Sequence, residues 1–375
     1  MGNSVVSAGK VKSIVEKLEK HPDVAKVLLL TLSGSHAYGT NMEGSDVDIR
    51  GVFVAKENVI RTPFKTVTEL NIEGEEDGKV YELSTFMTLF KEMNPNIIEL
   101  GFTDEESTLY EHEAWFGIKE NLHKLLNSNV AFRFSGYAMA QLKRIKGHNK
   151  HINNPQPKEM PTQFDYMRIV QSYLQSDPVL KHEDFIRKLK NANDFCILVP
   201  YGGDIYGVVP AYLETEPMFN PDGSIRALEY EKISDGVKKT APLFIVKYLR
   251  QEHNLAKEKH RNYWTWVENR NAKRHELEVK YGFDTKHAMH LVRLLRMGEE
   301  ILRTGTVIVK RHDAKELLAI RNGSKTYEEL VEWAEEKDKE IRGELYKNTK
   351  LPKRSDLKIA EALIMEAQDQ VWKDL

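Results

Sequence analysis

Apolar residues divide the first part of the chain into short elements. Residues 11–18 place apolar side chains on one helical face, and a second helical spacing starts at residue 85 and is stopped by the Asn-Pro-Asn at 94–96. Compact apolar runs bounded by glycine and polar turns predict strands between these helices. The predicted strands are residues 27–32, 47–54, 66–72 and 79–83, the last two forming a hairpin around residues 74–78.

Beyond about residue 128 the pattern becomes that of long helices. The predicted helices are residues 131–147, 162–175, 240–279, 285–303, 326–346 and 355–372. A small extended patch, residues 195–199 with 206–209, interrupts them around a Gly-Gly pair. We therefore place a boundary near residue 128, between an α/β domain of residues 1–128 and a mainly helical domain of residues 129–375.

Composition agrees with a globular protein. The chain has 375 residues, 41% of them hydrophobic and 30% charged, and this length favours two domains. Its single cysteine, Cys196, excludes an internal disulfide framework and a cysteine-based zinc ribbon. No apolar run approaches the ~20 residues of a membrane span, and the first residues do not resemble a secretory signal. We expect a soluble cytoplasmic protein with no membrane partner.

Charge is unevenly distributed along the chain. The net charge of −2 excludes a uniformly basic nucleic-acid binder. Residues 69–120 nevertheless carry 14 acidic and 3 basic side chains, whereas residues 133–150 carry 5 basic side chains and no acidic one. This asymmetry predicts separate surfaces with separate roles, so the net charge does not argue against an RNA partner.

The chemistry is concentrated in two neighbouring motifs. Gly34-Ser35 ends a predicted strand, where free backbone N–H groups of the turn can accept phosphate oxygens. Asp46 and Asp48 project from one face of the next strand about 7 Å apart, a spacing at which two carboxylates can share divalent ions. A phosphate seat beside a magnesium seat suits phosphoryl or nucleotidyl transfer.

A third carboxylate is expected to complete such a site. Glu82 is the candidate, because a charge on an otherwise apolar strand needs a partner such as a metal ion, and Glu69 is the reserve. The alternative for Glu82 is an ordinary residue of an edge strand. The segment around Gly34 lacks the Lys-Ser/Thr pair of a P-loop and the Gly-x-Gly-x-x-Gly of a dinucleotide fold, so neither an ATPase nor a dehydrogenase is favoured.

At these residues the sequence resembles the DNA polymerase β superfamily of nucleotidyltransferases. Ten residues separate Ser35 from Asp46, which fits the Gly-Ser and Asp-x-Asp pattern of that superfamily. More narrowly, the chain is similar to its RNA repair pathway polymerase β branch, found in bacteria and phages, over about residues 27–330. The motifs that carry this similarity are residues 34–39, 45–51, 94–99 and 281–295.

The resemblance implies an α+β fold, in which a polymerase-β-like nucleotidyltransferase domain with a small mixed sheet precedes a mainly helical domain. It also implies a Mg²⁺-dependent enzyme with two ions, for which Mn²⁺ is an alternative. Asp46 and Asp48 would be metal ligands and catalytic residues, completed by Glu82, and Gly34 and Ser35 would bind the triphosphate of an NTP such as ATP. His36 and Tyr38 lie in the same motif. His36 stands where many members have Arg, so a phosphate contact there would be weaker and pH-sensitive.

The predicted helix 285–303 adds a basic face. Lys286, His290 and Arg293 are spaced by four and three residues opposite an apolar stripe, so they could bind the β- and γ-phosphates, although an ordinary solvated face is the alternative. Basic and aromatic residues also mix at 132–150 and 257–274, a composition that suits RNA. His148 and His151 have the spacing of a helical metal pair, but no third ligand is evident and zinc is not predicted there.

The sequence therefore predicts an enzyme that transfers NMP from an NTP to an acceptor hydroxyl and releases pyrophosphate. An RNA end is the preferred acceptor, in RNA repair or modification, within a bacterial cytoplasm or that of a phage's host. One alternative is transfer to a protein hydroxyl of a toxin or host target. The other is a non-catalytic nucleotide- or RNA-binding module, against which the intact Gly-Ser and Asp-x-Asp motifs argue.

Overall fold

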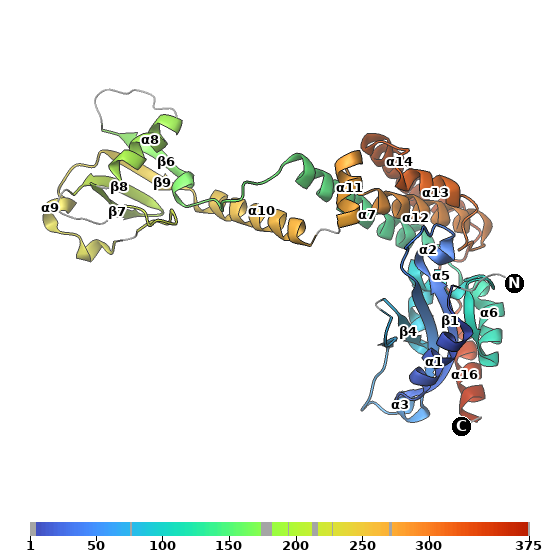
Figure 1. Ribbon diagram of the computed structural model, residues 1–375. Helices are drawn as coiled ribbons and strands as arrows, with labels where there is room; N and C mark the ends of the chain where they lie inside the picture. The colour runs from blue at the N-terminus through green and yellow to red at the C-terminus, as the bar shows by residue number, and fades with distance from the viewer. Residues whose placement is uncertain are drawn as a thin grey trace. The chain divides into compact units, whose positions relative to one another are not determined.

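A computed structural model describes residues 5–75, 77–173, 182–193, 195–211, 217–226, 228–269 and 272–373 (Figure 1). The chain forms two compact units. The first unit comprises Met1–Ile152 with Ala272–Leu375, and the inserted unit comprises Asn153–Asn271. None of the helices in the described ranges is long and apolar enough to cross a membrane.

A five-stranded mixed sheet forms one side of the first unit, with strand order β3-β4-β2-β1-β5. The strands are β1 (Val24–Ser33), β2 (Asp48–Ala55), β3 (Glu69–Asn71), β4 (Lys79–Glu82) and β5 (Thr108–Glu111). β1 is antiparallel to β2 and β5, β3 is antiparallel to β4, and β2 is parallel to β4. The predicted hairpin and small mixed sheet are confirmed, while β5 was not predicted.

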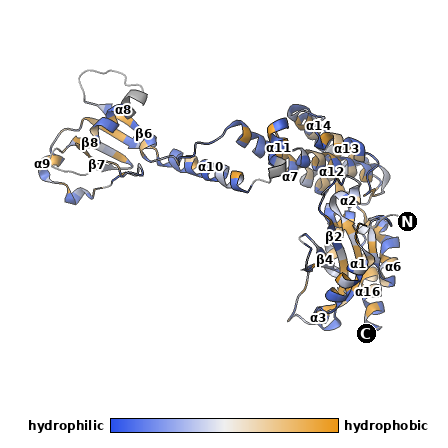
Figure 2. Cartoon of the chain, viewed as in Figure 1, coloured by the Kyte–Doolittle hydropathy of each residue, from blue (hydrophilic) through white to orange (hydrophobic). Residues whose placement is uncertain are grey.

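Helices cover the sheet and extend beyond it. They are α1 (Ala8–Glu19), α2 (Gly34–Tyr38), α3 (Glu57–Arg61), α4 (Leu83–Lys91), α5 (Pro95–Gly101), α6 (Phe116–Asn121), α7 (Val130–Asn153), α11 (Ala272–Tyr281), α12 (Thr285–Thr304), α13 (Ala314–Arg321), α14 (Tyr327–Glu340), α15 (Tyr346–Asn348) and α16 (Leu357–Lys373). A π-helical segment, Ile341–Leu345, joins α14 to α15. Figure 2 shows apolar and polar residues interleaved along α12 and α16, as expected for helices with one buried face.

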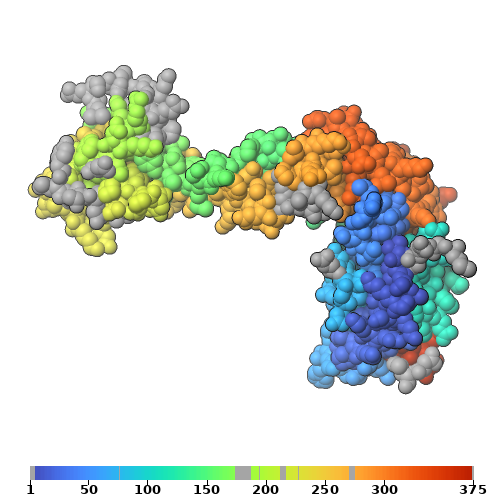
Figure 3. All heavy atoms as spheres, in the orientation of Figure 1, coloured from blue at the N-terminus to red at the C-terminus, as the bar shows by residue number. Residues whose placement is uncertain are grey.

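The predicted boundary near residue 128 does not divide these compact units. One apolar core joins Val52 of the sheet to Phe134 of α7, Leu291 of α12 and Val371 of α16. In Figure 3 the C-terminal residues, in red, lie beside the blue and teal atoms of the N-terminal part, and α16 contacts β1, α4 and α6. The late helices therefore belong to the same unit as the sheet, because they supply one wall of its core.

The inserted unit contains a second sheet, with strand order β6-β9-β8-β7. Its strands are β6 (Met167–Ser172), β7 (Cys196–Gly202), β8 (Ile205–Pro210) and β9 (Phe244–Tyr248), and its helices are α8 (His182–Ala192), α9 (Asp235–Lys238) and α10 (Arg250–Glu268). The β7–β8 hairpin is confirmed. The helices predicted at 162–175 and at the start of 240–279 are wrong in their described parts, because β6 and β9 pair there and bury Met167, Val246 and Tyr248 on one face.

Candidate active site

Gly34 and Asp48 meet where β1 ends and β2 begins. Ser33 pairs with Asp48, so the next residue, Gly34, lies against the aspartate side chain. A Cβ atom on Gly34 would stand 2.4 Å from Oδ2 of Asp48, and the backbone of Gly34 has a φ of +62°. Both facts require glycine at this position. The structure thus brings together the two motifs that the sequence singled out.

Negative charge accumulates around Asp48. Asp46 lies exposed just before β2. Partial burial raises the pKa of Asp48, and the charges of Asp77 and Asp46 raise it further, whereas Arg50 and Lys286 lower it. Carboxylates held this close favour a divalent cation, which removes their mutual repulsion.

Asp77 is a candidate site residue that the sequence interpretation missed. Arg50 pairs with Lys79 in the parallel β2–β4 ladder, and the same register continued by two residues aligns Asp48 with Asp77. Both aspartates line a cavity of about 750 Å³, together with Asn71 and Asn96. The available signal was the position of Asp77, two residues before a predicted strand, but the acidic run around it looked like an ordinary turn.

Glu82 does not complete this carboxylate group, and its predicted place is wrong. It pairs with Phe53, five residues beyond Asp48 along β2, which corresponds to about 16 Å. Side chains alternate between faces along a strand, so Glu82 points with Phe53 to the face opposite Asp48. Its carboxylate instead caps α4 by accepting hydrogen bonds from the backbone N–H groups of Ser84 and Thr85, at 2.6 and 3.3 Å.

The burial of Glu82 thus has a structural explanation. Burial raises the pKa of Glu82, while the hydrogen bonds from Ser84 and Thr85 oppose the rise. Glu69, the reserve candidate, forms an ion pair with Lys79 at 2.7 Å. Among the residues described, Asp77 rather than either glutamate lies beside Asp48.

A second cavity, of about 870 Å³, shares Arg50, Asp77 and Asn96 with the first. Helices α7 and α12 supply most of its other walls. These lining residues are Phe132, Arg133, Gly136, Tyr137, Ala140, Gln141 and Arg144 of α7, and Lys286, His287, His290, Arg293 and Leu294 of α12, with Tyr38 of α2. Three of the predicted nucleotide-binding residues of α12 therefore face the space next to the aspartates.

These α12 residues have different environments. Lys286 is half-buried and its charge acts on Asp48. Burial and then the charges of Arg293 and Lys286 hold the pKa of His290 well below its usual range, so its imidazole is neutral near pH 7. Lys286 is thus the α12 residue whose charge acts on Asp48, and His290 lines the cavity as a neutral polar side chain.

Arg293 is held by a buried pair of residues. Its Nη1 forms an ion pair with Oε1 of Glu99, and its guanidinium lies 3.7 Å from the centre of the Tyr38 ring. The Tyr38 hydroxyl donates to Oε2 of the same glutamate at 2.5 Å, and burial raises the pKa of that hydroxyl. Glu99 of α5 therefore ties α12 to α2, the helix that begins with Gly34 and Ser35.

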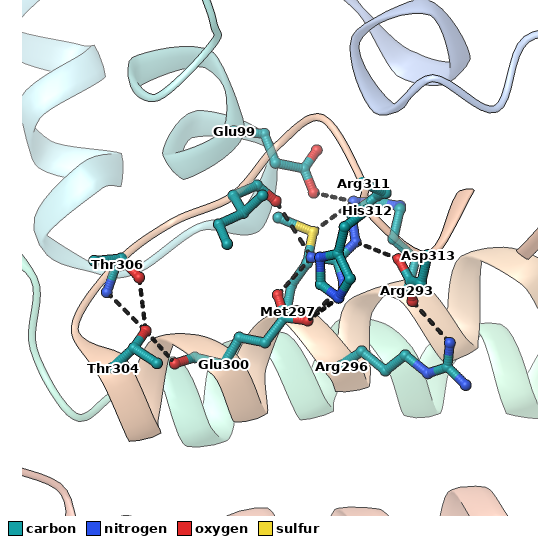
Figure 4. Close-up of polar contacts among 11 residues, drawn as sticks. Glu99, Arg293, Arg296, Met297, Glu300, Thr304, Thr306, Arg311, His312 and Asp313 are labelled. Carbon is teal, nitrogen blue, oxygen red and sulfur yellow. Dashed lines mark hydrogen bonds and ion pairs between the residues drawn. The ribbon is translucent and has the colours of Figure 1, made fainter. Parts of the chain in front are cut away.

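A second polar network anchors the chain after α12 (Figure 4). The Arg311 guanidinium, fully buried, pairs with Glu300 and Asp313, and Asp313 also pairs with Arg296 at 2.7 Å. The backbone N–H of Arg311 donates to the carbonyl oxygen of Tyr38 at 3.0 Å. Helix α2 is thus fixed from two sides, by Glu99 and by the segment after α12.

Ser35 and His36 lie within α2, which replaces the predicted turn. The Ser35 carbonyl accepts a hydrogen bond from the Thr40 N–H at 2.9 Å, which closes the helix. Nε2 of His36 is buried and makes no hydrogen bond among the described residues. Of the two basic and aromatic stretches, 132–150 lies on α7 and contributes to the cavity, whereas the described part of 257–274 before residue 270 lies on α10 of the inserted unit.

Comparison with known proteins gives a family match for the first part of the chain. Residues 8–184 match the model of the RNA repair pathway DNA polymerase beta family. No curated protein and no solved structure matches the chain. The matched residues include the whole mixed sheet, with Gly34, Asp48 and Asp77, and all of α7. Over residues 8–184, therefore, the chain is similar to the RNA repair pathway DNA polymerase beta family.

Proposed function

We propose that this protein transfers NMP from an NTP to an acceptor hydroxyl, with an RNA end as acceptor, in a Mg²⁺-dependent reaction that releases pyrophosphate. The observation that carries the proposal is the convergence of Gly34, Asp48 and Asp77 at one end of the parallel β2–β4 pair. The family match supports the class of reaction. The single cysteine favours a reducing, cytoplasmic setting.

The acidic residues at this position fit magnesium, with Mn²⁺ as an alternative ion. Mg²⁺ is held by a few carboxylates together with substrate phosphates, and here Asp46, Asp48 and Asp77 would supply the carboxylates. Two ions held this way would activate the attacking hydroxyl and neutralise the leaving pyrophosphate. The side chain of Asp48 lies close to Gly34, which limits the directions in which the Asp48 carboxylate oxygens can point. We infer that Asp77, in place of Glu82, is the third carboxylate.

The triphosphate would lie between α2 and α12. Backbone N–H groups at Gly34 and Ser35 are the proposed phosphate donors at one side, and the Lys286 ammonium is the proposed cation at the other. Because Glu99 already accepts from Arg293, we assign Arg293 chiefly to positioning Tyr38 and hence α2. His36 and His290 are proposed to contact the nucleotide, and His290 would do so as a neutral imidazole near pH 7.

The acceptor would enter along α7. Arg133 and Arg144 offer cations for a phosphate backbone, and Phe132 and Tyr137 offer rings for stacking, all on the wall of the larger cavity. This composition favours an RNA end over a protein hydroxyl. Transfer to a protein hydroxyl is the second candidate function, and it predicts that the transferred NMP is found on protein and not on RNA.

The test is label transfer from each α-³²P-labelled NTP in the presence of Mg²⁺ or Mn²⁺. Acceptors are total RNA, single-stranded DNA and cell protein, and pyrophosphate release is measured in parallel. We expect label on RNA with wild-type protein and no transfer with Asp48→Asn. Label on protein alone would select the second candidate, and the absence of transfer to all acceptors would refute an enzymatic function.

A further inference from the structure

A second group of metal-ligating side chains lies apart from the aspartates, where α7, α11 and α12 meet (Figure 1). It consists of His148 on α7, Glu278 on α11 and Asp284 at the N-cap of α12. One ligand atom from each lies within 4.8 Å of those of the other two. Helix α7 and the junction of α11 with α12, which are far apart in sequence, thus bring nitrogen and oxygen donors together.

The distance between His148 and Glu278 fits tetrahedral coordination. Ligands about 2.0–2.1 Å from a zinc ion are about 3.3–3.4 Å from one another. Nδ1 of His148 lies 3.1 Å from Oε1 of Glu278. Nε2 of His287 lies 3.6 Å from Oδ2 of Asp284, and its ring is 5.8 Å from that of His148. His287 therefore lies next to Asp284, but it is not one of the three residues whose ligand atoms lie together.

Burial makes this group unlike a surface cluster. Glu278 and Asp284 are only 1% and 2% exposed, so their charges are removed from water at the same place. A divalent ion bound here would attract both carboxylates more strongly than at the protein surface, because the surroundings are poor in water. His148 keeps 24% of its side chain exposed, which leaves a path for an ion to enter.

We propose that His148, Glu278 and Asp284 bind one divalent transition-metal ion, with zinc as the ion whose coordination fits best. Imidazole nitrogens suit zinc and disfavour magnesium, so this site and the aspartates would select different ions. The ion would join the end of α7 to the start of α12 and so position Lys286, two residues after Asp284. The spacing of His148 and His151 alone gave no third ligand. The actual partners of His148 come from residues about 130 positions later.

The experiment measures zinc binding by the full chain in an Asp46→Asn, Asp48→Asn background, so that zinc on the proposed catalytic carboxylates does not contribute. Metal-stripped protein is titrated with Zn²⁺ against a chromophoric chelator, with Mg²⁺ in excess. We expect one tight site per chain, and Co²⁺ in its place should give the intense visible absorption of tetrahedral coordination. Because nucleotidyl transfer is not the readout, failure of the proposed function leaves this test intact.

Variants locate the site. His148→Gln and Asp284→Asn should each weaken zinc binding at least about tenfold. The matched controls are His151→Gln, one turn along α7, and Glu276→Gln, an exposed neighbour of Glu278 on α11, which should bind as the background does. Circular dichroism establishes that each variant is folded, and Zn²⁺ should raise the melting temperature of the controls only. Absence of a stoichiometric site, or equal binding by Asp284→Asn and Glu276→Gln, would overturn the proposal.

Discussion

The two ends of the β2–β4 pair carry acidic side chains in opposite settings. At one end Asp48 and Asp77 line a cavity, and the charge of Asp77 raises the pKa of Asp48. At the other end Glu82 is buried, points to the opposite face and satisfies the first N–H groups of α4. A buried carboxylate on an apolar strand can therefore be a helix cap. Alignment with another carboxylate across a ladder is the better indication of a metal site.

The largest effect should come from removing a carboxylate at the cavity end. We expect Asp77→Asn and Asp48→Asn each to lower the rate of label transfer about 10³-fold or more, because metal-ion catalysis supplies several kcal/mol. Single-turnover rates at saturating NTP and Mg²⁺ measure this loss. A rate for Asp77→Asn within a few-fold of wild type would show that Asp77 is not the third carboxylate of the site.

Gly34 tests whether the close approach to Asp48 matters separately from backbone conformation. Gly34→Ala places a methyl group 2.4 Å from Oδ2 of Asp48, so the carboxylate must move. We expect about a 10- to 100-fold slower transfer, since small misplacements at a reacting centre are costly. The matched control is Gly44→Ala, which has a similar φ of +75° but no atom within 4 Å.

Both glycine variants should lose about 1–2 kcal/mol of stability from the left-handed backbone, measured by urea denaturation. Only Gly34→Ala should also lose transfer activity and Mg²⁺ affinity. Equal activities of the two variants would mean that the contact with Asp48 has no role in catalysis.

Sequence patterns predicted the cavity end in part. Gly34, Asp46 and Asp48 were found because their order along the chain is enough to place them together. Glu82 was chosen as the third carboxylate and Asp77 was missed, because the β2–β4 register decides which carboxylate lies beside Asp48, and a single sequence does not give the register of a parallel pair. The same limit explains β6 and β9, whose short apolar runs also suit one face of a helix.

The helical part shows a different limit. The periodicity of α7, α12 and α16 was read correctly, but periodicity does not say which core a helix joins. Only the contacts of Phe134 and Val371 with the sheet's core place these helices in the first unit. Likewise Arg293 lies on the predicted face, while its pairing with Glu99, 194 residues earlier, is a tertiary fact.

Arg293 offers a test of positioning with a smaller effect on the rate. Arg293→Met leaves Glu99 buried without its cation, and we expect a loss of about 3–5 kcal/mol in stability. The double variant Arg293→Met, Glu99→Gln should recover part of this stability, because the uncompensated charge is gone. Transfer should slow about tenfold, with a raised KM for NTP, through displacement of Tyr38 and α2. A rate loss as large as that of Asp48→Asn in a folded protein would instead indicate direct contact with the triphosphate.

Glu82→Gln should have the smallest effect on the rate of transfer, because Glu82 lies at the other end of the strand pair from Asp48. We expect transfer within about threefold of wild type, because a helix cap about 16 Å from Asp48 does not reach the reacting atoms. The pH dependence of the free energy of unfolding should differ between Glu82→Gln and wild type. Burial raises the pKa of Glu82 in the folded protein above its unfolded value, so the stability contributed by the protonated form is present at low pH and is lost as pH rises through the folded pKa. The glutamine variant lacks this loss. Its stability relative to wild type should therefore increase as pH rises from the unfolded to the folded pKa of Glu82.

At pH 7 the two proteins should differ by less than about 1 kcal/mol, because two consequences of the substitution oppose each other. The amide removes a buried charge and keeps an oxygen for Ser84 and Thr85, but its NH₂ group takes the place of Oε1, which has no hydrogen-bond partner among the described residues. Glu82→Ala, which deletes the cap, should be about 1 kcal/mol less stable than Glu82→Gln at every pH, because neither variant titrates at this position. Urea denaturation at pH 4 to 8 separates these cases. If Glu82→Gln were as inactive as Asp77→Asn while remaining this stable, the buried end of the strand pair would have a catalytic role that its hydrogen bonds do not explain.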